Sequence, residues 1–268
     1  MAQKRFTNKV VTVTGSARGI GKNILRAFAR EGASVIISDF NQELGYATEK
    51  EFQKEGLNAR FLEIDLSQKG TPNAMIQKII EMHGKIDILV NNARSGKRLG
   101  VLEETEETWD FGLSVTLKAA FFSAQEAIRS MSKTGGGAIV NISSIAGFSV
   151  CKESPSYHIA KAGMMQMTRY LAVNAGQYGV RVNAVLPGFI VQDEHQERYS
   201  RNDNQSYRDV VEFCHPLGNV GQSDDIARTV LFLCSPEATF ISGECITVDG
   251  GVSVQDQSTL LYRFDGQL

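Results

Sequence analysis

Short apolar runs alternate with longer amphipathic stretches along most of the chain. The runs are rich in β-branched residues, are followed by glycine or polar residues, and lie at 10–14, 34–38, 59–64, 86–90, 138–142, 181–186 and 245–248. Runs of this length and composition are typical of buried strands. The stretches between them, such as 20–31 and 73–82, place apolar side chains at helical spacing. The pattern predicts an α/β fold, a doubly wound, mostly parallel seven-stranded sheet with helices on both faces.

Four predicted helix starts carry a hydroxyl residue ahead of proline or acidic side chains. Thr71 and Ser154 each precede a proline, and Thr105 and Ser223 each precede two acidic residues. A hydroxyl oxygen can accept from the first free amides of a helix, while proline and acidic residues suit its first turn. We therefore expect these four residues to be N-caps.

The pattern predicts one domain over residues 1–268, with two segments outside the regular alternation. Residues 192–207 are polar and charged, which predicts a mobile loop or lid that reaches to about 215. The tail at 252–268 carries Leu260, Leu261, Tyr262 and Phe264. We expect this apolar tail to pack on the body of the protein or on a neighbouring subunit.

Composition excludes several classes of partner. The formal net charge of −2 gives no basic surface of the kind that nucleic acid or an anionic membrane requires. The four cysteines, Cys151, Cys214, Cys234 and Cys245, are scattered without a CxxC pair, so we expect a reducing compartment and no metal site. No apolar stretch has the length of a signal core or a membrane span. These features predict a cytoplasmic protein.

A glycine-rich turn, TGSARGIG at 14–21, follows the first predicted strand and opens a helix. Glycines let a pyrophosphate approach the backbone amides and the positive end of the helix, so the turn predicts dinucleotide binding. Asp39 ends the second strand, where a carboxylate can bind both hydroxyls of an adenosine ribose and repel a 2′-phosphate. Asp39 favours NAD, whereas Arg18 could pair with that phosphate, which leaves NADP open. The alternative for Asp39 is a turn residue at the strand end.

Tyr157 and Lys161 stand four residues apart, so they share one face of the helix that starts near Pro155. At about 4 Å and an effective dielectric of about 20, a unit charge is worth about 4 kcal/mol, enough to lower a phenol pKa by about three. Lys161 could therefore make Tyr157 a usable acid or base at neutral pH. Ser144 closes the fifth strand, at the edge where open α/β sheets bind their ligands.

Together, these motifs resemble those of the short-chain dehydrogenase/reductase family, a Rossmann-type oxidoreductase family, from about residue 9 to 251. The matching motifs are the glycine turn at 14–21, Asp65, the Asn-Asn-Ala at 91–93, Ser144, Tyr157 with Lys161, the Asn-Ala-Val-Leu-Pro-Gly at 183–188 and the Val-Asp-Gly-Gly at 248–251. The resemblance implies that Ser144 binds the substrate oxygen, Tyr157 moves its proton, and Lys161 assists and holds the nicotinamide ribose. It also implies a homo-oligomer, a tetramer or dimer, formed through 105–132 and 154–177.

The resemblance further implies which residues hold the cofactor. Asp65 would contact the adenine, Asn92 the cofactor backbone, and the amide of Ile190 the carboxamide. The full expected set is Gly15, Ser16, Arg18, Gly19, Ile20, Gly21, Asp39, Asp65, Leu66, Asn92, Ala93, Tyr157, Lys161, Pro187, Gly188 and Ile190.

Three positions depart from the family pattern. Arg94 stands where a glycine is usual, and Gln192 stands where a threonine usually bonds the carboxamide. Thr116 replaces an asparagine that holds a water of the proton relay, and we keep it as a catalytic candidate because its hydroxyl can still donate and accept. With Lys97 and Arg98, Arg94 forms a basic cluster that could bind an anionic substrate group, the alternative being a solvated loop.

These residues predict an oxidoreductase that transfers a hydride between NAD(P) and a small hydroxyl or carbonyl substrate. A second hypothesis is a nucleotide-binding scaffold or sensor that has lost turnover through Thr116 and Arg94. A third, an epimerase or dehydratase of nucleotide sugars, is disfavoured because no sizeable substrate domain follows the sixth strand.

Overall fold

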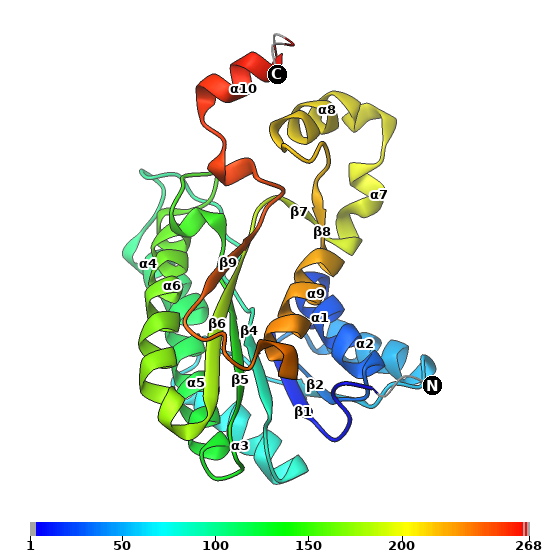
Figure 1. The fold of residues 1–268 in the computed structure, drawn as a ribbon, viewed down its shortest axis with the longest axis vertical. Helices are drawn as coiled ribbons and strands as arrows, with labels where there is room; N and C mark the ends of the chain where they lie inside the picture. Colours follow the sequence, from blue (N-terminus) through cyan, green and yellow to red (C-terminus); the bar gives the residue numbers. More distant parts are fainter. Residues whose placement is uncertain (1–3, 265, 267–268) are drawn as a thin grey trace.

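A seven-stranded parallel sheet forms the centre of the computed structural model, which describes residues 4–264 and 266 (Figure 1). The strand order is β3-β2-β1-β4-β5-β6-β9, and every neighbouring pair is parallel. The strands are β1 Val10–Thr14, β2 Ser34–Asp39, β3 Ala59–Glu63, β4 Ile88–Asn91, β5 Gly137–Ile142, β6 Val180–Pro187 and β9 Cys245–Val248. The predicted doubly wound α/β sheet is confirmed.

Helices cover both faces of this sheet and enclose two apolar cores (Figure 1). On one face lie α1 Gly19–Arg30, α2 Gln42–Lys54 and α9 Ser223–Cys234; on the other lie α3 Thr71–His83, α4 Glu106–Leu113, α5 Ala119–Met131 and α6 Pro155–Ala175. Because helices cover both sides, all five residues of β1 are buried, which is why the strand reads as a continuous apolar run. None of the helices among the described residues combines the length and apolar character needed to cross a membrane.

The predicted N-caps are correct at two positions and wrong at two. Thr105 and Ser154 accept from backbone amides three residues ahead, as expected. Thr71 and Ser223 are instead the first residues of their helices. The N-cap of α3 is Gly70 in the left-handed region, and at α9 Gln222 and Asp225 satisfy each other's backbone amides, so neither helix needs the hydroxyl residue as a cap.

The polar segment expected to be a loop at 192–207 instead contains helical turns. Two short strands, β7 Ile190–Val191 and β8 Gly221–Gln222, pair in parallel and frame it, and α7 Gln196–Tyr199 and α8 Gln205–Cys214 lie between them. Its polar residues form local backbone and side-chain hydrogen bonds that support short helices, such as that from Arg208 to the Tyr199 carbonyl oxygen. Short helical turns also lie at Ile145–Gly147, Gly176–Tyr178, Asp193–His195, Asn202–Asn204, Pro236–Ala238 and Val252–Val254.

The described part of the C-terminal tail contacts α8. Helix α10 Gln257–Phe264 places the Phe264 ring edge-on against Phe213, with 6.0 Å between the ring centroids, and the Arg263 guanidinium lies over the Phe213 ring. Arg263 also donates to the His215 carbonyl oxygen at 3.3 Å. Residues 265, 267 and 268 of the expected tail, like residues 1–3, lie outside the described part of the chain.

We expect Gly45→Ala in α2 to lower the free energy of unfolding by about 1–3 kcal/mol. A Cβ at Gly45 would lie 2.1 Å from the Phe61 ring, so the helix would have to move away from β3. Gly176→Ala is the control, because nothing lies within 4 Å of the added atom and the backbone there is already helical. Urea denaturation of the three proteins checks this; equal midpoints for both variants would contradict it.

Candidate active site

The predicted proton-transfer residues meet where β5 ends and α6 begins. Ser144 follows β5, and its hydroxyl accepts from the Ala146 amide at 3.1 Å, which fixes the turn after the strand. Ser154 accepts from the Tyr157 amide, so Tyr157 lies in the first turn of α6. Lys161 follows one turn later, with its Nζ 5.5 Å from the centroid of the Tyr157 ring. Strand end and helix start therefore bring the three side chains together, as the sequence predicts.

Lys161 is buried within the protein rather than exposed on the helix surface. Only 1% of its surface is accessible, and its Nζ donates to the Ile142 carbonyl oxygen at 2.6 Å. Burial, and to a lesser extent the Arg94 guanidinium, lower the pKa of Lys161 to about 7. Burial therefore disfavours the positive charge of Lys161.

The pKa of Tyr157 moves in the direction opposite to the expected one. Burial raises the pKa of the phenol above its ordinary value, while the Arg94 charge and a hydrogen bond with Ser144 act against that rise. The expectation treated Lys161 as a full positive charge and left out burial, which disfavours the charged form of both groups. In this structure Tyr157 is accordingly a proton donor at neutral pH.

Thr116 lies in a π-helical turn, Ser114–Lys118, between α4 and α5. It is 1% exposed, and its hydroxyl accepts from the Ser95 amide at 3.2 Å. Single π turns inside helices often mark functional sites. The threonine thus ties the helix to the loop after β4, and its part in proton transfer stays a prediction.

The glycine turn forms a cradle with its glycines where the backbone is crowded. Gly15 and Gly19 have positive φ angles of 64° and 58°. A Cβ at Gly21 would lie 2.5 Å from the Gly15 carbonyl oxygen and 2.7 Å from Nδ2 of Asn92. Asn92 donates to the carbonyl oxygens of Thr14 and Gly15, each at 2.9 Å, and so joins the end of β4 to the turn.

The start of α1 has the electrostatics of an anion site. Arg18 at its N-cap provides no side-chain hydrogen bond to the helix, and the first turn contains no acidic residue. The first-turn amides and the positive end of the helix dipole favour an anion here, although the side chains of Gln192 and Glu194 also approach Gly19. The residues present fit a pyrophosphate group.

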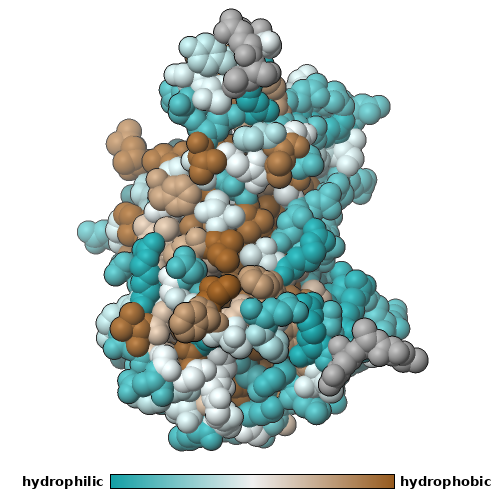
Figure 2. Space-filling model, viewed as in Figure 1, coloured by the Kyte–Doolittle hydropathy of each residue, from teal (hydrophilic) through white to brown (hydrophobic). Residues whose placement is uncertain are grey.

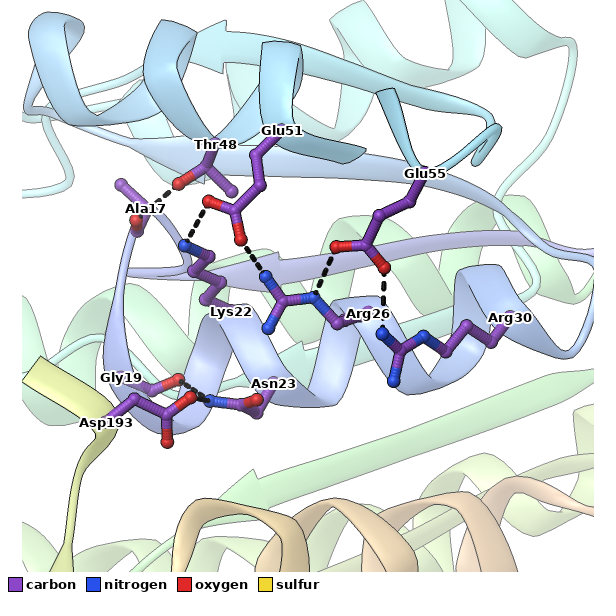
Figure 3. A network of polar contacts seen from close by, with 10 residues as sticks. All are labelled: Ala17, Gly19, Lys22, Asn23, Arg26, Arg30, Thr48, Glu51, Glu55 and Asp193. Carbon is purple, nitrogen blue, oxygen red and sulfur yellow. Dashed lines mark hydrogen bonds and ion pairs between the residues drawn. The ribbon is translucent and has the colours of Figure 1, made fainter. Parts of the chain in front are cut away.

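Helix α1 is held against α2 by a row of ion pairs (Figure 3). Glu51 accepts from Lys22 at 2.6 Å and pairs with Arg26, and Glu55 pairs with Arg26 at 3.1 Å and with Arg30 at 2.8 Å. Isolated surface pairs contribute little, but a connected row fixes the register of two helices. The row therefore holds the helix that begins at the cradle.

Asp39 ends β2 as predicted, and its carboxylate is already hydrogen-bonded to the backbone. It is 8% exposed and accepts from the amides of Ala17 and Asn41, each at 3.0 Å. Two hypotheses for Asp39, ribose binding and a turn residue, both depended on its position at the end of the strand. The structure shows the hydrogen bonds expected of a turn residue. Each carboxylate oxygen of Asp39 keeps a further lone pair that can accept a hydrogen bond from a ribose hydroxyl.

The family model described as enoyl-(acyl carrier protein) reductase matches residues 15–253. The chain belongs to the short-chain dehydrogenase/reductase family. It is 35% identical to the 3-oxoacyl-[acyl-carrier-protein] reductase FabG of Chlamydia muridarum over 92% of this chain and 98% of that protein. It is 37% identical to the (2S)-[(R)-hydroxy(phenyl)methyl]succinyl-CoA dehydrogenase subunit BbsD of Thauera aromatica, over 92% and 97%.

A solved structure agrees with this assignment. The crystal structure of a candidate short-chain alcohol dehydrogenase from Sinorhizobium meliloti 1021 superposes with a TM-score of 0.86 and is 31% identical, covering 95% of this chain and 100% of that one. The protein is thus an oxidoreductase of this family, and its Rossmann-type sheet is confirmed.

The segment 192–194, directly after β7, contains two acidic residues and lies beside the glycine turn. The sequence did not predict this contact. A Cβ at Gly19 would lie 2.0 Å from the side-chain oxygen of Gln192 and 3.2 Å from that of Glu194. Asp193 accepts from Nδ2 of Asn23 at 2.9 Å (Figure 3), and Glu194 lies 4.0 Å from the Arg18 guanidinium. In the sequence, three polar residues directly after Val191 could have suggested this contact with the cradle. The sequence does not show the direction in which their side chains point.

Other predicted cofactor residues lie where the strands end. Asp65 follows β3, and hydrogen bonds from Ser67 and Gln68 lower the pKa of its carboxyl. Gly188 follows β6 and donates its amide to the Val248 carbonyl oxygen at 3.0 Å, and Ile190 begins β7. The remaining members of the set at these positions are Ser16, Ile20, Leu66, Ala93 and Pro187. Ser16 is fully buried and donates to the Val13 carbonyl oxygen, so its hydroxyl stabilises the turn itself.

The basic cluster after β4 divides into two environments. Arg98 pairs with Glu153 at 2.9 Å, whereas the Arg94 guanidinium lies 5.4 Å from the centroid of the Tyr157 ring. His158 points away from this contact, with Nδ1 bonded to the Ser154 carbonyl oxygen and Nε2 accepting from the Cys151 amide. Both ring nitrogens of His158 therefore have backbone partners.

A separate hollow of about 400 Å³ lies between α7, α8 and β8. Tyr199 and Glu212 line it and are hydrogen-bonded to each other at 3.0 Å. None of the predicted catalytic residues lines this hollow.

We expect Lys161→Met to change the pH dependence of stability. A lysine in the unfolded chain has a pKa of about 10.4, whereas the pKa of Lys161 in the folded protein is about 7. Between these two pH values the unfolded chain therefore binds more protons than the folded protein. The free energy of unfolding of the wild type therefore rises with pH through this window relative to the variant, by an amount on the order of a few kcal/mol. Urea midpoints of both proteins at about pH 7 and about pH 9.5 measure the difference, and a pH-independent difference would refute the expectation.

Proposed function

We propose that this protein transfers a hydride between a nicotinamide dinucleotide and a small hydroxyl or carbonyl substrate. One observation carries the proposal: Ser144, Tyr157 and Lys161 lie together after β5, at the same sheet edge as the glycine cradle after β1. Dinucleotides bind at this edge in open α/β sheets, where the strand order reverses between β1 and β4.

The cofactor would lie across this edge. The first-turn amides of α1, from Gly19 to Gly21, would hold the pyrophosphate. Asn92 and Ala93 would contact the cofactor after β4, and Lys161 would meet the nicotinamide ribose. When bound, the nicotinamide ring gives or accepts the hydride. The residues of the chain orient the substrate and move the proton.

In the reducing direction, Tyr157 donates its phenolic proton to the substrate oxygen, and Ser144 holds that oxygen by a hydrogen bond. In the oxidising direction, Tyr157 as phenolate takes the hydroxyl proton. Because burial raises the pKa of Tyr157, its phenol carries the proton that the reducing direction requires at neutral pH.

We propose NAD as the preferred cofactor, with NADP as the alternative. Asp39 places a buried negative charge at the end of β2, which disfavours a 2′-phosphate there. Arg18, the residue that favoured NADP, lies near Glu194, so part of its charge is balanced.

We further propose a cytoplasmic homo-oligomer without nucleic-acid, membrane or metal partners. Leu117, Phe121, Phe122 and Met167 line an apolar groove between α5 and α6, within the ranges 105–132 and 154–177. Apolar surface also covers the α6 and β9 side of the face drawn in Figure 2. Faces of this kind are stable in water when a second copy covers them.

Tyr157→Phe should lower turnover by about 10²–10⁴-fold while leaving the dissociation constant of NADH unchanged, because it removes the proton and little else. Absorbance of NADH with a panel of ketones measures turnover, and NADH fluorescence measures binding. Tyr170→Phe, which removes an exposed hydroxyl from the same helix, is the control. NADH binding without oxidation by any ketone in the wild type would favour the scaffold hypothesis, and full activity of the Tyr157 variant would refute the mechanism.

Asp39→Asn should raise the kcat/KM ratio of NADPH to NADH by about tenfold or more, because it removes the charge that repels a 2′-phosphate. Glu63→Gln is a matched control, since Glu63 is the register partner of Asp39 on β3 and also ends its strand. If both variants shift the ratio equally, the preference comes from the general field at this edge and not from Asp39.

A further inference from the structure

Arg94 is a cation at the proton-transfer site to which the proposed chemistry assigns no contact with the substrate. Its guanidinium carbon lies 5.4 Å from the centroid of the Tyr157 ring, and its Nη1 donates to the neighbouring Ser95 carbonyl oxygen at 3.1 Å. Within residues 4–264, no carboxylate lies within ion-pair distance of it. An arginine that faces a reacting group without a carboxylate partner is suited to an anion from outside the chain.

Arg98, the other arginine of the same loop, has a carboxylate partner. Its Nε donates to Glu153 at 2.9 Å, and the Glu153 side chain is only 13% exposed, so the pair fixes the loop against the start of α6. The sequence offered both arginines as anion ligands. The structure separates them, because Arg98 already has its carboxylate and Arg94 does not.

The charges around Tyr157 also favour an anion at Arg94. Lys161 and Arg94 both lie near the phenol ring, and Arg94 lowers the pKa of both Tyr157 and Lys161. Among the described residues, Glu153 is the carboxylate that raises the pKa of Tyr157, and it is paired with Arg98. A substrate carboxylate at Arg94 would balance the remaining positive charge beside Lys161.

We propose that Arg94 determines specificity by binding a carboxylate of the substrate, so that the protein acts on short oxo and hydroxy acids. The planar guanidinium can bind a carboxylate through two parallel hydrogen bonds, which fixes the orientation of the acid as well as its position. Because Arg94 lies over the ring of Tyr157, the acid group and the reacting carbonyl must be close together in the substrate. This inference rests on the proposed function and names the substrate class for the same site.

The first experiment measures binding without turnover. Ketones form unreactive complexes with the NAD⁺-bound enzyme, so their dissociation constants can be measured by calorimetry in the presence of saturating NAD⁺. The probes are three matched pairs of acid and amide: pyruvate and pyruvamide, acetoacetate and acetoacetamide, levulinate and levulinamide. The wild type should bind at least one acid about tenfold or more tightly than its amide.

The variants then assign this preference to one side chain. Arg94→Gln should abolish the difference between acid and amide by weakening the acid alone. Arg98→Gln should keep the difference, because its cation is already bound by Glu153. A wild type that shows no acid preference, an Arg94 variant that weakens acid and amide equally, or an Arg98 variant that loses the preference to the same extent would each overturn the proposal.

The second experiment measures turnover with NADH on the same pairs. The kcat/KM of the preferred acid should fall by about tenfold or more in Arg94→Gln, while that of the amide stays within about threefold. An acid preference in binding without oxidation of NADH would refute the proposed function and leave the Arg94 site standing. Turnover that is equal for acids and amides would refute the Arg94 site and leave hydride transfer standing.

Discussion

The parallel direction of β1, β4, β5 and β6 is the constraint on which the site depends. Parallel strands end on the same edge of a sheet, so residues that follow different strands meet there although they are far apart in the chain. The glycine turn follows β1, Asn92 follows β4, Ser144 follows β5 and Gly188 follows β6. Hydrogen bonds between these turns, such as those from Asn92 to Thr14 and Gly15, then fix the distances.

Burial decides the electrostatics of the site more strongly than pairing does. Lys161 is surrounded by the protein and bound by one backbone carbonyl, so its charge is costly and its pKa lies near neutrality. Burial also raises the pKa of Tyr157, and the Arg94 charge and the hydrogen bond with Ser144 offset only part of that rise. An arginine of the loop after β4 therefore influences the electrostatics of Tyr157 and Lys161, which the spacing of these two residues in the sequence does not reveal.

The sequence predicted the fold with few errors. Apolar runs of four to six residues located all seven strands of the sheet, because central parallel strands such as β1 are buried on both faces and are therefore mostly apolar. The errors lay at helix ends and in polar segments. Thr71 and Ser223 were displaced as caps by Gly70 and by the Gln222–Asp225 pair, and the segment at 192–207 is partly helical because hydrogen bonds among its polar residues support short helices.

By itself, the sequence determined which chemical groups are present and which strand each one follows, because strand periodicity and motif spacing are local properties of the chain. The tertiary structure alone decided the burial of Lys161, the pairing of Arg98 with Glu153 and the position of Arg94 over Tyr157. It also placed Gln192, Asp193 and Glu194 beside the glycine cradle. These properties depend on contacts between residues distant in the chain, and a pKa or an ion pair is set by the distances and solvent exclusion that such contacts create.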